Sequence, residues 1–140
     1  MIKEENGRNL SDLSKFLKKL RIDHSEFLGD MADKLEISAA HLSSVESGRK
    51  TVPADFADKI TALYGLSAEE KTKLETFIAK SNREVSVNLN SIPLGKDLSE
   101  YASTAVMFAK DISKLDTDHL KQIQAILMQC EQNRGNHMVK

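Results

Sequence analysis

Apolar residues recur every three or four positions along most of the chain, which is the spacing of helices that bury one face. This repeat predicts an all-α fold, in which five short helices are followed by two longer ones. We expect the helices at about residues 13–24, 28–35, 39–47, 53–64, 68–81, 98–115 and 118–132.

Residues at the helix ends support these boundaries. Ser38 stands where a side chain can cap the third helix, and Gly48 ends it. Pro53 is expected as the first residue of the fourth helix, because a residue in that position needs no N–H donor. The run from Ser67 to Glu70 has the composition of a capping box ahead of the fifth helix.

The helical spacing is interrupted once. Val85 and Val87 alternate with polar residues, the two-residue period of an exposed strand or an extended linker. The sequence therefore divides into five parts. These are a flexible N-terminus at 1–10, a helical domain at 11–82, an extended linker or short strand at 83–96, a helical region at 97–132 and a flexible tail at 133–140.

Composition and charge narrow the function classes. Of the 140 residues, 40% are hydrophobic and 29% charged, which is ordinary for a folded globular protein. The formal net charge is −1, so a surface that binds a polyanion must gather its cations locally. Cys130 is the only cysteine, which excludes an intrachain disulfide and favours a reducing, cytoplasmic setting. No run has the length and apolarity of a membrane span, so we expect no membrane partner.

The third helix has an outward face of unusual composition. Solvated helix faces are usually rich in Glu, Lys, Gln and Arg, which favour the helix. Here Leu42 and Val45 turn inward, and the outward side chains are alanine, serine and histidine. Such a face suits close contact with a DNA major groove, where hydroxyl and imidazole groups reach base edges and alanine methyls meet thymine methyls.

The order of the elements favours the same interpretation. A helix, a short turn and a second helix with a polar front form a helix-turn-helix, whose second helix enters the groove by its N-terminal end. Free N–H groups at that end, and cations just beyond the other end, would contact phosphates. We expect base contacts from Ala39, Ala40, His41, Ser43 and Ser44, and phosphate contacts from Ser38, Ser47, Arg49, Lys50, Lys18 and Lys19.

The segment LEISAAHLSSVESGRKTVP, residues 35–53, resembles the helix-turn-helix of the Cro and lambda-repressor (XRE) family. The likeness extends to the five-helix count of residues 11–82. It implies a lambda-repressor-like domain that binds double-stranded DNA. It also implies a structural pair between Arg21, late in the first helix, and Glu46 in the third.

Three positions depart from the family pattern. Leu28 stands where the family often has a glutamine that contacts a phosphate. Glu36 replaces the usual glycine of the turn, and a non-glycine residue in a left-handed conformation costs roughly 1 kcal/mol. Ala39 and Ala40 occupy positions where glutamine or arginine often reads bases. These departures predict modest DNA affinity per head.

The sequence offers little support for a metal site, a catalytic site or a redox site. His24, His41, His119 and His137 lie in four different segments, so we expect no metal site and no cofactor. The sequence has neither a phosphate-binding loop nor a nucleophile elbow, and an enzyme is therefore not expected. Cys130 falls on an apolar stripe, which favours a packing role over a redox role.

The last two predicted helices are amphipathic, but two helices alone bury little surface. We therefore expect residues 97–132 to form a homodimer interface that supports two recognition helices roughly 34 Å apart. Two function classes fit. One is a transcriptional repressor on a palindromic operator. The other is an antitoxin or similar regulator, whose C-terminal helices bind a partner protein while the head autoregulates its operon.

Overall fold

The protein is described by a computed structural model of residues 10–139, with side chains described for residues 10–132. The described chain is helical and contains no strand, so the prediction of an all-α fold is confirmed. Its contacts divide it into two units, Met1–Ser86 and Val87–Lys140. The expected flexible N-terminus at 1–10 lies outside the described residues except for its last position.

Five α-helices make up the described part of the first unit. They are α2 (Asp12–Asp23), α3 (Leu28–Leu35), α4 (Ala39–Glu46), α5 (Phe56–Tyr64) and α6 (Ala68–Asn82). As the sequence predicts, Ser38 caps α4 and Ser67 forms a capping box with Glu70 at the start of α6.

The start of α5 differs from the prediction. This helix begins at Phe56, whereas Pro53 was the expected first residue, and residues 53–55 form a turn. The reason is a contact far along the chain. The N–H of Val52 donates to the side-chain oxygen of Asn82 at 2.9 Å, and its carbonyl accepts from the same amide at 3.1 Å. Because Val52 is held to the end of α6 and buried, the helix starts only after the chain has turned.

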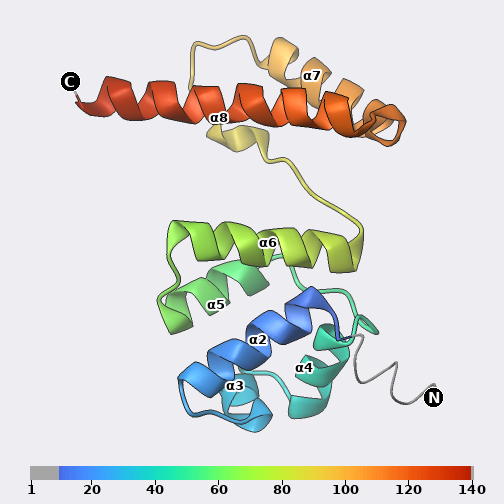
Figure 1. Ribbon diagram of the computed structural model, residues 1–140, viewed down its shortest axis with the longest axis vertical. Helices are drawn as coiled ribbons and strands as arrows, with labels where there is room; N and C mark the ends of the chain where they lie inside the picture. Colours follow the sequence, from blue (N-terminus) through green and yellow to red (C-terminus); the bar gives the residue numbers. More distant parts are fainter. Residues whose placement is uncertain (1–9, 140) are drawn as a thin grey trace. The chain divides into compact units, whose positions relative to one another are not determined.

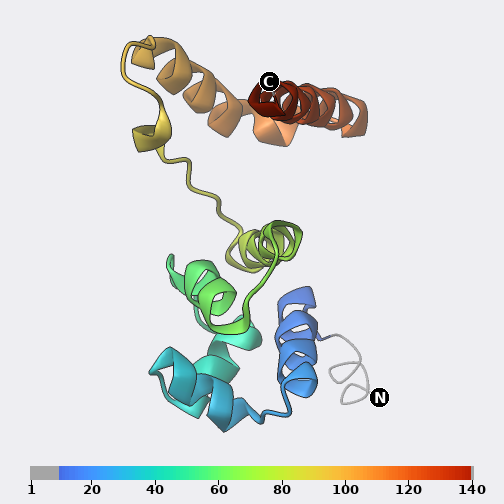
Figure 2. The ribbon, with the colours of Figure 1, turned by 90° about the vertical axis from the view of Figure 1, so that its left-hand side faces the viewer.

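The five helices enclose one core. Helix α6 packs on α2 and α5, while α3 and α4 pack on the opposite side of these two helices (Figures 1 and 2). Each helix contributes a side chain with no exposed surface: Leu17, Met31, Leu42, Ile60 and Leu74. Full burial of such a side chain is worth about 1.5–3 kcal/mol relative to exposure, so this layer holds the unit together.

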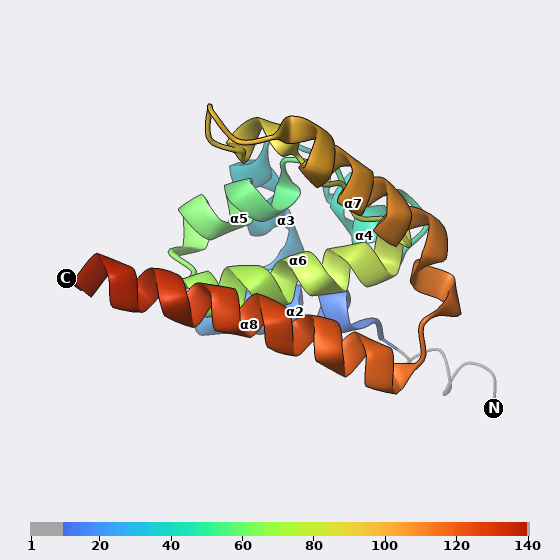
Figure 3. The same cartoon turned by 90° about the horizontal axis from the view of Figure 1, so that it is seen from above.

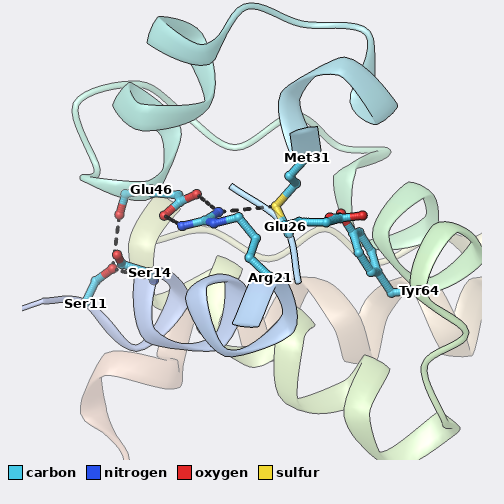
Figure 4. A network of polar contacts seen from close by, with 7 residues as sticks. All are labelled: Ser11, Ser14, Arg21, Glu26, Met31, Glu46 and Tyr64. Atoms are coloured by element: carbon cyan, nitrogen blue, oxygen red, sulfur yellow. Dashed lines mark hydrogen bonds and ion pairs between the residues drawn. The ribbon is translucent and has the colours of Figure 1, made fainter. Parts of the chain in front are cut away.

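A buried ion pair joins α2 to α4 inside this core. The guanidinium of Arg21 donates to the two carboxylate oxygens of Glu46 at 2.6 and 3.2 Å, and each side chain is only 7% exposed (Figure 4). The same guanidinium lies 3.3 Å from the sulfur of Met31 in α3. The hydroxyl of Ser11 donates to the Glu46 carbonyl at 3.1 Å, so the start of α2 is also tied to the end of α4.

A second polar cluster holds the α2–α3 turn against α5. The hydroxyl of Tyr64 donates to the Glu26 carboxylate at 2.6 Å (Figure 4). Lys34 forms an ion pair with the same carboxylate. Lys34 and Tyr64 both lower the pKa of Glu26, with Lys34 the larger cause. Burial and the Glu26 carboxylate raise the pKa of Tyr64. The carboxylate therefore stays charged in the fold, and the tyrosine stays protonated.

The second unit consists of four helical segments. They are the short 3-10 helix η1 (Leu89–Ser91), α7 (Leu98–Asp111), the 3-10 helix η2 (Ile112–Lys114) and α8 (Thr117–Val139). Asp116 caps α8 by accepting from the His119 N–H at 2.9 Å. Helices α7 and α8 diverge from the turn at residues 112–116 (Figure 3).

Of the two alternatives expected for residues 83–96, the short strand does not form. Residues 84–88 have no regular structure, and within the described residues no second strand lies beside them. Residues 133–139 continue α8 instead of forming a flexible tail. A single glycine at position 135 costs a helix only about 1 kcal/mol, and no proline follows to stop it.

The buried ion pair leads to a first prediction. The change Glu46→Ala leaves the guanidinium of Arg21 buried without its carboxylate, so the free energy of unfolding should fall by about 3–5 kcal/mol. Chemical denaturation of the purified protein measures this loss. The control is Asp23→Ala, which removes the exposed pair with Lys19 and should cost less than about 1 kcal/mol. Equal losses in the two variants would contradict the role given to the buried pair.

A second prediction concerns acid stability. The pKa of Glu26 is lower in the fold than in the unfolded chain, so its stabilising contribution is complete above the unfolded pKa of about 4.3 and is lost as pH falls through the folded pKa. Glu26→Gln should therefore lose less free energy of unfolding than the wild type between pH 5 and pH 3. Thermal denaturation at several pH values measures this, with Glu84→Gln as an exposed control. A slope in Glu26→Gln as steep as in the wild type would disprove it.

Candidate nucleic-acid interface

Helix α4 is anchored by one side and open on the other. Leu42 and Val45 have no exposed surface, and Glu46 is held by Arg21, so three of its eight residues point into the core. The remaining α4 side chains form the surface that the sequence predicts to read bases. Ala39 and Ala40 are exposed, and His41, Ser43 and Ser44 are half-buried.

The turn before α4 has the strained residue that the family resemblance implies. Glu36 has φ 60° and ψ 39°, a left-handed conformation that glycine adopts more easily. The turn spans only residues 36–38, and the Ile37 N–H donates to the Ala32 carbonyl at 3.0 Å to close α3. The Glu36 side chain is exposed beside the start of α4. A polyanion that reached this end of α4 would therefore meet one carboxylate.

The N-terminal end of α4 has free backbone donors. Ser38 caps the helix by accepting from the His41 N–H at 3.0 Å, so the N–H groups of Ala39 and Ala40 remain directed outward from the first turn. The helix dipole adds partial positive charge at the same end. This end of α4 can therefore accept a phosphate or a base edge.

The C-terminal end of α4 is closed by the two residues that carry the predicted phosphate-binding cations. The backbone N–H groups of Arg49 and Lys50 both donate to the Ser44 carbonyl, at 2.9 and 3.1 Å. This arrangement requires Gly48 in the left-handed region, at φ 82°. Because the backbone of both residues is fixed and their side chains are exposed, the two cations are presented from a rigid base.

One hollow in the surface brings together residues from α2 and α4. We call it the α2–α4 hollow, and the buried pair of Arg21 and Glu46 lies among the residues that line it. Cations and hydroxyls in one depression match the groups that bind phosphate oxygens in nucleic-acid complexes. Its polar lining also includes Ser11, Ser14, Lys18, Ser43, Ser47 and Arg49.

The structure thus separates the predicted phosphate contacts into two groups. Lys18, Ser47 and Arg49 share the α2–α4 hollow, whereas Ser38 and Lys50 lie outside it. Lys19 also lies outside and forms an ion pair with Asp23 at 3.1 Å on the exposed side of α2. The charge of Lys19 is therefore already offset by a neighbour.

Sequence reasoning missed two serines of this hollow. Ser11 caps α2 by accepting from the Ser14 N–H at 3.0 Å, and Ser14 is buried against α4. A serine just before an amphipathic helix signals a cap, so the position of Ser11 was predictable. Its proximity to Glu46, 35 residues away, was not. Leu28 also lines the hollow and gives it an apolar wall.

Within the part of the chain that the structure describes, no three histidine, cysteine or acidic side chains come together as a metal site requires. No described helix combines the length and apolarity needed to cross a membrane. Comparison of the chain with protein-family models, with curated proteins and with solved structures finds no match.

The α2–α4 hollow generates a third prediction. Lys18→Gln and Arg49→Gln should each weaken binding to all DNA sequences alike and reduce the slope of log affinity against log salt by about one unit. The matched control is Lys19→Gln, on the next residue of the same helix, which should change the slope by less. Titration of labelled duplex at several salt concentrations measures all three variants. The assignment fails if Lys19→Gln has the larger effect, or if all slopes equal that of the wild type.

Proposed function

We propose that the protein is a sequence-specific DNA-binding transcriptional regulator of the Cro and lambda-repressor type, with α4 as its recognition helix. It acts as a repressor, occupying a palindromic operator as a homodimer. The observation that carries this proposal is the construction of α4. Its inner side is fixed by two buried apolar residues and an ion pair, and its outer side consists of alanine, serine and histidine side chains, with no acidic residue, lysine or arginine.

The distribution of charge supports the proposal. The chain as a whole has a net charge of −1, yet Arg49 and Lys50 follow α4 directly, and Lys18 shares the α2–α4 hollow with Arg49. A near-neutral protein with cations beside its recognition helix gains phosphate contacts where the helix enters the groove. The base contacts then come from His41, Ser43 and Ser44, because Ala39 and Ala40 offer only methyl groups.

A second candidate function is that of an antitoxin or another regulator whose C-terminal helices bind a partner protein. One observation favours it, since α7 and the described part of α8 contain no buried side chain. Such helices need another surface to cover them, and a different protein would serve. The two candidates share the DNA-binding head and differ in what α7 and α8 contact.

Selection of bound sites from random duplex DNA tests the proposed function. We expect an inverted repeat with half-site centres about 10–10.5 base pairs apart, or a multiple of this spacing. His41→Ala and Ser44→Ala should each change the preferred bases, with a loss of about 1–3 kcal/mol at the affected position. Ser103→Ala, an exposed serine of α7, serves as the control.

The outcomes of this selection separate the parts of the proposal. Failure to enrich any sequence would overturn the assignment of sequence-specific binding. Enrichment of the same sequence by the wild type and by both α4 variants would mean that another face contacts the bases. A single, unpaired half-site would contradict the homodimer.

A further inference from the structure

The second unit lacks a core within one chain. None of its described side chains, from residue 87 to 132, is buried. By contrast, the described part of the first unit buries fourteen hydrophobic residues. Isolated helices are marginal in water, and a unit of about 60 residues is stable only when its apolar surface is covered. The apolar faces of α7 and α8 therefore require a contact that one chain does not supply.

These faces are continuous stripes. In α7, apolar side chains at Leu98, Tyr101, Ala105, Phe108 and Ile112 follow the three- and four-residue spacing of one helix face. The stripe of α8 consists of Leu120, Ile123, Leu127 and Cys130, which alternate by three and four residues like the seam of a helical bundle.

The two stripes do not cover each other. Helices α7 and α8 diverge from their common turn (Figures 2 and 3), and among their described side chains only Ala102, Ala105 and Ile123 are half-buried. Leu127, farther along α8, remains 60% exposed. Most apolar side chains of α7 and α8 are therefore accessible to another surface.

Charge indicates what kind of surface fits. Between residues 98 and 109 Glu100 is the only acidic or basic residue, and between 120 and 130 Lys121 is the only one. A surface with so little charge offers no complementarity to a strongly acidic or basic partner. It is instead complementary to itself, because apolar stripes from two copies meet without repulsion between like charges.

The exposed area also fits. Ten apolar side chains of α7, η2 and α8 are between 36% and 66% exposed. Six of them lie on the two stripes and present on the order of 500 Å² of apolar surface per copy, so a contact between two copies would bury about 1,000 Å² in total, the size at which specific interfaces begin. These six are Leu98, Tyr101, Phe108, Ile112, Leu120 and Leu127. Burial of this area between two copies would give the second unit the core that it lacks.

We propose that α7 and α8 associate with α7 and α8 of a second copy to form a four-helix bundle. Two copies of α7 and α8 related by a two-fold axis place the same stripe residues on both sides of an isologous contact. The four-helix bundle gives the homodimer of the proposed function its contact surface. It rests on the proposed function only for the biological role of the dimer. The association itself requires no DNA.

The test therefore uses the full chain without DNA. Sedimentation at tens of micromolar protein should show a dimer for the wild type. The double variant Ile123→Lys with Leu127→Lys places charge on the α8 stripe and should be monomeric. The matched control, Gln122→Lys with Gln129→Lys, adds the same charge on the opposite side of α8 and should remain dimeric. Thermal unfolding of the first unit should be the same in both variants, since neither pair of changes touches its core.

Cys130 supplies a second measurement on the unmodified protein. Its thiol is exposed in one chain and lies within the α8 stripe, so a bundle would shield it. Alkylation of Cys130 should slow as the wild-type concentration rises, and should stay fast in the stripe variant.

A monomeric wild type with an alkylation rate independent of concentration would overturn the proposal. A stripe variant that remains dimeric would also overturn it, because the dimer would then form through a surface other than the α8 stripe. Because neither measurement contains DNA, a failure here leaves the site selection experiment to decide DNA binding separately.

Discussion

The ion pair between Arg21 and Glu46 is the constraint on which the rest of the first unit depends. Removing two charges from water costs several kcal/mol for each ion unless the partners are close and well bonded. Two N–H···O bonds and a methionine sulfur meet that condition here. Apolar contacts tolerate small shifts of one helix against another, but this pair does not. It therefore fixes α4 against α2 in one register, and with it the relative positions of Lys18 and Arg49.

The composition of α4 follows from this anchoring. A helix of eight residues is not stable alone, and serine is a weak helix former. The small polar face can nevertheless be maintained, because Leu42, Val45 and Glu46 supply the stability from the inner side. A helix held by its own propensity would need alanine, glutamate or lysine on its outer face. Anchoring by the core thus leaves the outer residues free to serve contact with another molecule.

Local signals made much of the fold predictable. Helical spacing gave the five helices of the first unit, Ser38 and Ser67 marked two helix starts, and the left-handed turn fell at Glu36. The errors came from contacts between distant positions. The start of α5 is displaced because Val52 bonds to Asn82, and the pairing of Glu26 with Tyr64 spans 38 residues. No periodicity or capping pattern encodes such contacts, because they arise only when the helices pack.

Part of the candidate interface could also be predicted from the sequence. The outward residues of α4 follow from the inward position of Leu42 and Val45, and the pair of Arg21 with Glu46 was implied by a family resemblance. The sequence did not show that Lys18 and Lys19 lie in different surroundings, since adjacent lysines on a predicted helix look equivalent. Only the placement of α4 beside α2 shows that Lys18 shares a hollow with Arg49, while Lys19 turns toward Asp23.

Each unit lacks something that a second copy of the chain could supply. The first encloses its own core, but under the proposed function its contacts with DNA would be few, since Leu28 is apolar and two alanines begin α4. The second has apolar surface that one chain leaves exposed. If two copies join through α7 and α8, the binding of one head raises the effective concentration of the other near its half-site to about the millimolar range. Affinity then comes from two weak heads acting together, and sequence discrimination improves because both half-sites must match.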